Sequence, residues 1–322
     1  MDNDSDYLSA WVAIISRSPK STTLKYALGK SFIEIARYDL TEGDFNIPKR
    51  EIASRFIEYY WAQEFIYRFR QTTNPLGIPN VVKILRDVWQ EPQKLKQKPK
   101  DTPEQHGLAC DRIVKECFKE VIPRFHNIKG GSTTIRFFEN SRGYITIPRQ
   151  AGTFLRKHEA ILTQNINYHW SLWLERINST PRISSKVTAG FNPQRKSLSK
   201  YKKKLSFVQN SCFYCDCNLS ETQSIHVDHF IPWSYIFEDS MWNLVLTCRE
   251  CNLRKSDKLP SHEYLEKLFS RNSSLPEALS PEVRTEFERS FWSIPGYDQN
   301  VEEGIRGLYL GAKNDGVPIL KL

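Results

Sequence analysis

The chain has 322 residues and a formal net charge of +9, from 46 Lys and Arg against 37 Asp and Glu. Its length favours two domains, and its 26% of charged and 39% of hydrophobic residues are ordinary for a globular protein. No apolar run approaches the roughly 18 residues that a membrane-spanning helix needs, so no membrane partner is expected.

The N-terminal sequence and the distribution of cysteines indicate in which cellular compartment the protein is expected. The first residues, MDNDSDYLSAW, are acidic and lack the basic start of a signal peptide. Five of the seven cysteines cluster between positions 212 and 251, which fits a reducing compartment rather than a disulfide framework. These features predict a cytoplasmic protein. The other two, Cys110 and Cys117, are expected to be buried as small apolar residues.

Residues 1–180 read mainly as helices. One helix is indicated by an apolar stripe at helical spacing: Leu24, Leu28, Phe32 and Ile35. Pro48 stands at the first turn of a longer helix, Lys49–Phe69. The many aromatic side chains of that helix indicate burial in a core rather than a platform for stacking bases.

Further elements complete this first domain. Helices are predicted over Pro79–Trp89, Leu108–Val121 and residues 150–178. A Lys-rich stretch at 91–105 is read as a solvated loop, and Thr133–Phe138 with Tyr144–Ile147 as a β-hairpin. We expect a recognition or regulatory role for the domain, with a protein partner as one candidate.

A stretch at 180–192 with Pro, Gly and Ser marks the domain boundary. Residues 181–210 form a basic connector with eight Lys and Arg and no acid, whereas residues 211–322 carry a net charge of −6. Positive charge of this density suits a nucleic-acid backbone. Within the connector, Arg195–Leu205 is expected to be a basic helix that faces nucleic acid rather than only solvent.

Two Cys-x-x-Cys pairs, Cys212/Cys215 and Cys248/Cys251, stand 32 residues apart. Two thiolates on one tight turn reach a single ion, and a second such turn completes a tetrahedral four-sulfur shell. The spacing therefore predicts a structural zinc. Cys217 is an alternative ligand to Cys215, although the two-residue spacer of the other pair favours Cys215.

Between the cysteine pairs, residues 225–228 alternate with a strand period, and a second apolar run covers 243–247. The run Arg249–Lys258 has no Gly or Pro and is read as a short helix. The expected arrangement is strand, strand, helix around a polar centre. His226 shares a strand face with Asp228, and its role stays open between a site residue and an exposed strand residue.

With the pair Asp228-His229, then Asn243 and Asn252, residues 195–260 resemble the HNH endonucleases of the ββα-metal fold. The two Cys-x-x-Cys knuckles indicate the zinc-containing subtype. Asn252 replaces the His that names the family, a variation that also occurs in the HNH domain of RNA-guided CRISPR nucleases. The resemblance implies a single hard metal, an Asn243 that orients His229, and products with 5′-phosphate and 3′-hydroxyl ends.

The residue types suit that chemistry. Asp228 and Asn252 offer oxygen ligands of the kind that Mg²⁺ or Mn²⁺ prefers. The pKa of histidine side chains lies near neutrality, so His229 suits a general base that activates water, while the metal stabilises charge on the scissile phosphate. We expect metal-dependent hydrolysis of DNA, most simply double-stranded DNA.

The expected fold class is mainly α with small β elements: a helical N-terminal domain, then a ββα-metal nuclease domain over 211–322. Helices at Ser261–Phe269, Pro281–Trp292 and Asn300–Ala312 should pack on the nuclease motif, which is too small to bury a core alone. Basic residues expected to contact DNA are Arg195, Lys196, Lys200, Lys203, Lys204, Arg249, Arg254 and Lys255.

Two other interpretations stay open. A non-catalytic zinc module that binds nucleic acid would keep the four cysteines but would need neither Asp228-His229 nor Asn252. A regulated effector, for instance in restriction or phage defence, would keep the nuclease and use the N-terminal domain to bind a partner or signal.

Overall fold

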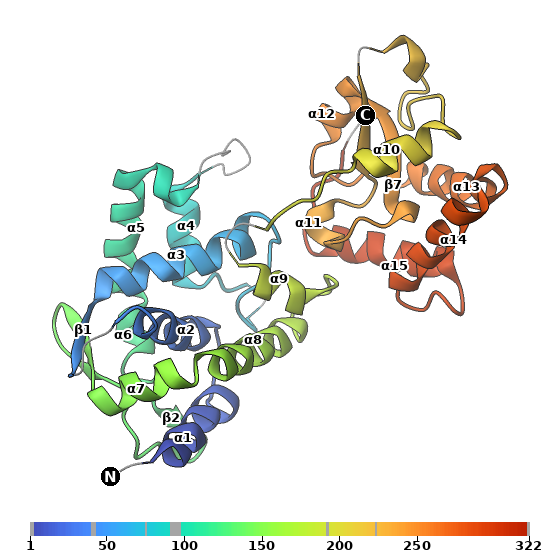
Figure 1. The fold of residues 1–322 in the computed structure, drawn as a ribbon. Helices are drawn as coiled ribbons and strands as arrows, with labels where there is room; N and C mark the ends of the chain where they lie inside the picture. Colours follow the sequence, from blue (N-terminus) through green and yellow to red (C-terminus); the bar gives the residue numbers. More distant parts are fainter. Residues whose placement is uncertain are drawn as a thin grey trace. The chain divides into compact units, whose positions relative to one another are not determined.

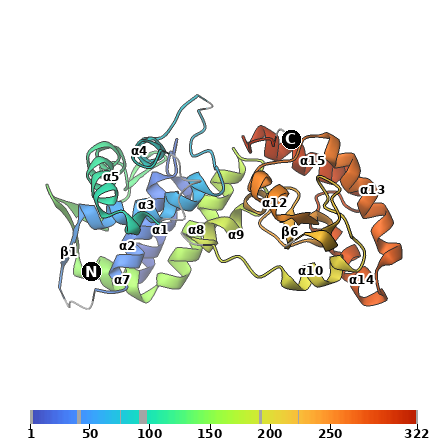
Figure 2. The ribbon, with the colours of Figure 1, turned by 90° about the horizontal axis from the view of Figure 1, so that it is seen from above.

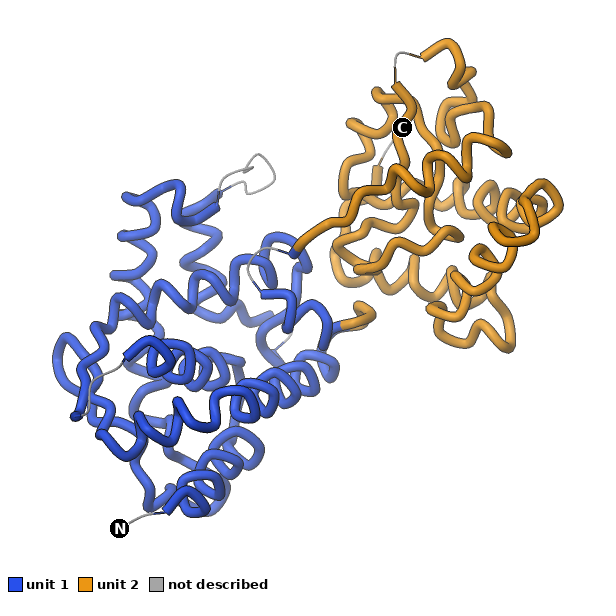
Figure 3. The backbone as a smooth tube through the Cα atoms, in the orientation of Figure 1, with its two compact units in different colours: residues 1–178, 183–193 blue, residues 179–182, 194–322 orange. Residues whose placement is uncertain are grey.

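The computed structural model describes residues 3–39, 43–74, 76–90, 98–190, 193–222 and 224–320. The chain divides into two compact units, residues 1–178 with 183–193, and residues 179–182 with 194–322 (Figure 3). Both are mainly helical with small sheets, as predicted (Figure 1). Among the described residues, none of the helices combines the length and the hydropathy that a bilayer span requires.

The segment 181–210 does not act as one connector. Helix α9 (Ile183–Ala189) belongs to the first unit and packs on α8 (Glu159–Glu175). Helix α10 (Ser199–Ser206) belongs to the second unit and packs on its strands. The expected basic helix over 195–205 is therefore shorter at its N-terminus, where residues 195–198 are not helical.

Helix α2 (Leu24–Ala36) is the centre of the first unit. Twelve of its 13 residues are buried, so the predicted apolar stripe is one face of a helix that is covered on nearly all sides. It packs against α3 (Lys49–Phe65) and α8. The remaining helices of the unit are α1 (Asp4–Arg17), α4 (Asn80–Val88), α5 (Pro103–Glu116), α6 (Phe118–Val121) and α7 (Arg149–Lys157).

The aromatic helix α3 lies in the core, as predicted: Phe56 and Tyr60 have no exposed surface. It ends at Phe65 rather than Phe69, and Arg68 then adopts the left-handed φ of 58°. Cys110 and Cys117 are buried, as expected. Residues 91–97 of the predicted Lys-rich loop lie outside the described residues.

The predicted β-hairpin is wrong in one of its strands. Strand β5 (Tyr144–Ile147) pairs with β4 (Glu139–Asn140) and with β1 (Phe45–Pro48), not with residues 133–138. Phe137 and Phe138 are both buried, which a strand with one solvent-facing side does not allow for consecutive residues. A separate short pair joins β2 (Asn127–Ile128) to β3 (Gly131–Ser132).

The second unit is built on an antiparallel pair, β6 (Ile225–His229) and β7 (Leu244–Cys248). Helix α12 (Arg249–Lys255) follows β7 directly and, like α10, contacts both strands (Figure 2). A short helix, α11 (Trp233–Ile236), lies in the connection between the strands. The predicted order of strand, strand and helix is therefore present.

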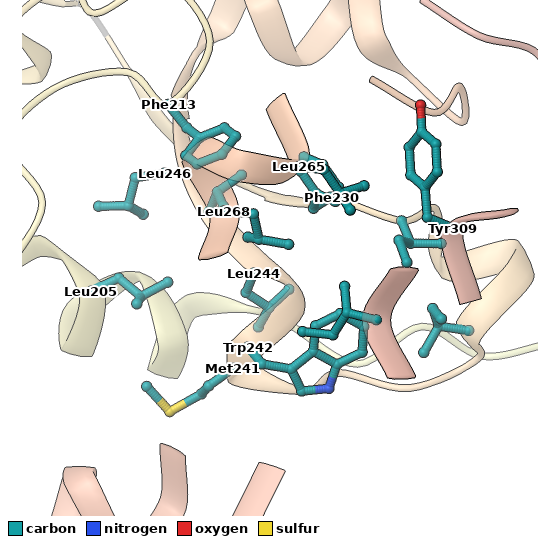
Figure 4. Packing of buried hydrophobic residues seen from close by; sticks show 14 of the residues in the cluster. Leu205, Phe213, Phe230, Met241, Trp242, Leu244, Leu246, Leu265, Leu268 and Tyr309 are labelled. Carbon is teal, nitrogen blue, oxygen red and sulfur yellow. The ribbon is translucent and has the colours of Figure 1, made fainter. Parts of the chain in front are cut away.

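Three C-terminal helices complete the core of the second unit: α13 (Glu263–Ala278), α14 (Pro281–Ser290) and α15 (Val301–Asn314). Figure 4 shows side chains of α13 and α15 packed with those of β7 and the first cysteine knuckle. Leu265, Leu244 and Phe230 in this cluster have no exposed surface. The expectation that these helices cover the nuclease motif is confirmed.

His126 is a buried histidine of the first unit, with 4% of its surface exposed. Its Nε2 accepts a hydrogen bond from the backbone N–H of Phe137 at 3.0 Å, which requires an unprotonated nitrogen. Burial, with smaller contributions from Arg136 and Lys25, lowers the pKa of His126 from 6.5 to about 4.

We therefore expect acid to destabilise the first unit through His126. Between the unfolded pKa of 6.5 and the folded pKa of about 4, the unfolded chain binds a proton that the native chain does not. As the pH is lowered through that window, the free energy of unfolding should decrease, by up to about 3 kcal/mol from this group. Urea unfolding of the full chain at pH 7 and pH 4.5 measures the decrease. His126→Gln should reduce it, and an equal decrease in the variant would contradict the assignment.

Candidate active site

The pairing register of β6 and β7 sets the geometry of the site. Ile225 lies opposite Cys248 at one end of the pair, and His229 lies opposite Leu244 at the other. The two ends are four residue steps apart, about 13 Å at the rise of a strand. The cysteines are thus held at one end of the hairpin and the Asp228-His229 pair at the other.

A cavity of about 360 Å³ opens beside the Asp228-His229 end. Its lining includes Asp228, His229 and Asn252, the three residues predicted to carry the chemistry. Asn252 comes from α12, and the other two come from the end of β6. The fold therefore brings these separate sequence positions to one concave surface.

His229 has a carboxylate partner that sequence reasoning missed. Its Nε2 lies 3.0 Å from Oδ1 of Asp239, and both side chains are largely buried. Asp239 lines the same cavity. A carboxylate at this position fixes the ring orientation and favours the tautomer that carries hydrogen on Nε2. No signal in the sequence singled out Asp239, because it stands in the connection between the two strands.

Asp228 sits in a buried network. The hydroxyl of Tyr214 donates to its Oδ2 at 2.8 Å, and the Lys255 ammonium lies 3.0 Å from the same oxygen. The Lys255 ammonium also donates to the carbonyl of His229 at 2.6 Å. Burial, and then the nearby Asp228 carboxylate, raise the pKa of Tyr214 well above its usual value, so the hydroxyl keeps its proton.

Lys255 corrects one prediction. It was expected to contact DNA, but its side chain has no exposed surface and its charge is matched by Asp228. The signal available in the sequence was its spacing: Lys255 follows Asn252 by three positions on a helix, so it shares the face of α12 that turns toward β6.

Asn243 is fully buried and holds the backbone that follows His229. Its carboxamide donates to the carbonyl of Ile231 and accepts from the N–H of Ile231, both at 2.8 Å. The Asn243 carbonyl accepts from the N–H of Phe230 at 2.7 Å. The expected link to His229 therefore runs through the backbone of the next two residues, while the ring itself contacts Asp239.

The oxygen donors fit a hard cation. Asn252 is half-buried in the cavity wall, and within the described part of the chain no group hydrogen-bonds to its carboxamide. Asp228 also lines the cavity, and an ionised carboxylate offers about four lone-pair sites, more than its two neighbours use. A carboxylate and an amide oxygen on one concave surface match the ligand preference of Mg²⁺ or Mn²⁺. His226 instead contacts Ser224 and does not line the cavity.

The sulfur atoms of Cys212, Cys215, Cys217 and Cys248 lie within 4.8 Å of one another. Those of Cys215 and Cys248 are 3.9 Å apart, close to the roughly 3.8 Å that tetrahedral Zn–S bonds of about 2.3 Å require. Cys217 belongs to the cluster, although the spacing in the sequence favours Cys212, Cys215, Cys248 and Cys251 as the zinc ligands. The thiol of Cys251 interacts with those of Cys212, Cys215 and Cys248.

The cluster also favours thiolate at Cys215. Burial works to raise the pKa of this thiol, but hydrogen bonds from the Cys217 backbone and from neighbouring thiols outweigh it and lower the pKa to about 7. Thiolate is the form that binds metal. On the other knuckle, the Cys248 sulfur accepts from the backbone N–H of Cys251 at the start of α12. The donor set therefore fits zinc.

Two of the predicted basic residues lie at the cavity. Arg195 and Lys196 are part of its lining, and the Arg195 guanidinium lies 4.7 Å from the ring centroid of Trp233. Lys204 forms an ion pair with Glu286, so its charge is already compensated. The others are exposed on α10 and α12 outside the lining: Lys200, Lys203, Arg249 and Arg254.

Comparison with known proteins matches residues 212–261 to the family model described as HNH endonuclease. Neither a search of curated proteins nor a search of solved structures returned a match. The matched segment contains the cysteine cluster, both strands, α12 and the Asp228-His229 pair. Residues 212–261 therefore form an HNH endonuclease domain, a nuclease family that acts on nucleic acid.

Proposed function

We propose that the chain is a metal-dependent endonuclease that hydrolyses phosphodiester bonds of double-stranded DNA at the cavity of its second unit. The observation that supports this proposal is the convergence of Asp228, His229 and Asn252 on one cavity edged by Arg195 and Lys196. A carboxylate, an amide, an imidazole and two cations are the groups that a phosphodiester hydrolase needs.

His229 would act as the general base. Because Asp239 accepts from the Nε2 hydrogen, the free lone pair of the ring is on Nδ1, and Nδ1 takes the proton of the attacking water. Asp239 keeps the ring in this tautomer and stabilises the imidazolium that forms. Asn243 holds the backbone of Ile231, two residues after His229, and so helps to fix the position of the His229 ring.

Asp228 and Asn252 would hold the divalent ion, with Lys255 and Tyr214 fixing the orientation of the Asp228 carboxylate. When bound, Mg²⁺ or Mn²⁺ supplies Lewis-acid stabilisation of the charge that develops on the phosphate. Arg195 and Lys196 would hold the DNA backbone at the cavity edge through sequence-independent phosphate contacts.

We further propose a structural zinc held by Cys212, Cys215, Cys248 and Cys251, because each pair lies on a tight turn and the last residue is buried beside the other sulfurs. Five of the seven cysteines lie between positions 212 and 251, at the proposed zinc site rather than in a disulfide framework, which supports a reducing compartment such as the cytoplasm. A restriction or phage-defence effector is the biological setting that we propose for such an enzyme.

The zinc assignment is tested by two serine variants. Cys251→Ser should lose about one zinc per chain and destabilise the second unit, since zinc coordination contributes directly to folding. Cys217→Ser is the matched control and should keep its zinc, because that residue stands outside a Cys-x-x-Cys turn. Metal analysis of the purified proteins measures both. Zinc absent from Cys217→Ser and retained by Cys251→Ser would reverse the assignment.

The catalytic assignment is tested with a plasmid and added Mg²⁺ or Mn²⁺. His229→Ala should reduce cutting by about 10²–10⁴-fold while DNA binding persists, because only the base is removed. Asp239→Asn should keep residual cutting at a reduced rate, since the ring then lacks the carboxylate that orients it and stabilises the imidazolium.

Glu238→Gln is the control for Asp239→Asn, because this neighbouring carboxylate pairs with Arg182 and not with His229. It should leave the rate of cutting unchanged. Undiminished cutting by His229→Ala would exclude His229 as the base. DNA binding without cutting in the wild type, at any concentration of either metal, would favour the non-catalytic zinc module.

The role of Arg195 and Lys196 at the DNA backbone is tested by replacing both together with Ala. Binding to all DNA sequences should weaken alike, and the log–log salt dependence should flatten by about 0.9 for each phosphate that is no longer neutralised. Binding titrations of the metal-free protein at several salt concentrations measure both quantities. Lys313→Ala, an exposed residue on α15, serves as the control. A double variant that matches the control would remove Arg195 and Lys196 from the DNA interface.

A further inference from the structure

The first unit contains a cavity of about 340 Å³ that the nuclease chemistry does not use. Its wall is formed by the starts of α2 and α4, by the segment before each of them and by α5 and α6. The lining mixes apolar side chains, such as Leu24 and Val121, with the polar side chains Thr22, Asn74 and Asn80. Its volume lies within the range of about 300–1,000 Å³ that is usual for small-molecule sites.

Two lysines in this wall have no carboxylate partner within the residues that the structure describes. Lys25 is 6% exposed, and its ammonium contacts the Ser18 hydroxyl and the carbonyl of Asn127. Lys20 donates to the carbonyls of Ile15 and Ser18, at 2.7 and 3.2 Å. Burial lowers the pKa of Lys20 to about 7 and that of Lys25 to about 8, with Lys25 adding to the effect on Lys20.

The acidic residues of the wall do not supply the missing charge. The ionisable lining residues are Lys20, Lys25, Glu116, Cys117, Glu120 and Arg124. Glu116 pairs with Arg112 at 2.9 Å, and Glu120 pairs with Arg124. Among the described lining residues, Lys20 and Lys25 are therefore the charges that lack an ionic partner. A buried cation without a counter-charge is costly, and a bound anion would remove that cost.

The N-termini of α2 and α4, which lie at the cavity, also favour a bound anion. Neither α2 nor α4 has a side chain capping its N-terminus, and neither has an acidic residue in its first turn. At α2, the hydroxyl of the preceding Thr23 is engaged by Tyr60 and Gln71 instead. Unpaired N–H groups and the helix dipole favour negative charge at such a position.

From these observations we propose that the first unit binds a small organic phosphate in this cavity, with its phosphate group between Lys20 and Lys25. A phosphate monoester carries about two negative charges at neutral pH, which matches two ammonium groups and two helix starts. The remaining volume and the mixed lining accept an organic part up to about the size of a nucleoside. This binding is independent of the proposed cutting of DNA.

The test uses isothermal titration calorimetry and thermal unfolding of the full chain with three probes: inorganic phosphate, adenosine 5′-monophosphate and adenosine. Both phosphates should bind and raise the unfolding temperature, and adenosine should do neither. Lys20→Met with Lys25→Met should weaken phosphate binding at least about tenfold. Lys20→Met alone, at the less buried position, should weaken it in the same direction if the double variant fails to fold.

Two control variants locate the binding. Lys83→Met changes an exposed lysine on α4 outside the cavity wall, and Lys196→Ala changes the nuclease cavity. Both should bind phosphate like the wild type. Absence of binding by inorganic phosphate and adenosine 5′-monophosphate would overturn the proposal. So would binding that survives the Lys20 variant but disappears with Lys196→Ala, since the anion would then occupy the nuclease site.

Discussion

The second unit depends on a buried ion pair between Lys255 and Asp228. The Lys255 side chain has no exposed surface, and its ammonium bridges the Asp228 carboxylate and the carbonyl of His229. Removing one partner of such a pair costs about 3–5 kcal/mol, because the other charge stays buried and uncompensated. The pair therefore holds α12 against β6. Since Asn252 lies one helical turn before Lys255, the same interaction places its carboxamide in the cavity beside His229.

The opposite side of the site is held by hydrogen bonds to the backbone. Asn243 fixes Ile231, and Asn272 and Arg271 of α13 donate to the carbonyl of Trp242, at 3.1 and 3.5 Å. Helix α13 thus supports the strand connection from which Asn243 and Asp239 project. This explains why a motif of about 50 residues carries C-terminal helices: they cover its apolar face and also supply the donors for carbonyls that no sheet partner satisfies.

Site residues could be predicted from the sequence where the chemistry restricts their spacing. They could not be predicted where tertiary contacts determine which residues meet. Cysteine turns must place sulfurs within bonding distance of one ion, so Cys212, Cys215 and Cys248 of the cluster could be named from spacing alone. The partners Asp239 and Tyr214 could not, because their contacts with His229 and Asp228 arise from loops whose paths no local pattern sets. The prediction that Lys255 contacts DNA is wrong because a charged side chain is expected to be exposed to solvent, whereas the buried Asp228 carboxylate compensates the charge of Lys255. The strand predicted over 133–138 failed because its consecutive Phe137 and Phe138 serve the core.

Compensation of charge also distinguishes two pairs of lysines that are buried or half-buried. Lys255 lies against a carboxylate, and Lys30 lies near Glu34, which partly offsets the effect of burial on the Lys30 pKa. Lys20 and Lys25 contact hydroxyl and carbonyl groups, and the Lys20 ammonium lies 5.0 Å from the ring centroid of Tyr26, but neither contacts a carboxylate of the described residues. A structural role explains the first group, since each charge stabilises a contact between elements. It does not fully explain the second, because Lys20 and Lys25 donate to carbonyls near the end of α1 and at Asn127, but these contacts supply no counter-charge and the two ammonium groups repel each other. Uncompensated charge beside a cavity is instead the arrangement expected of a ligand site.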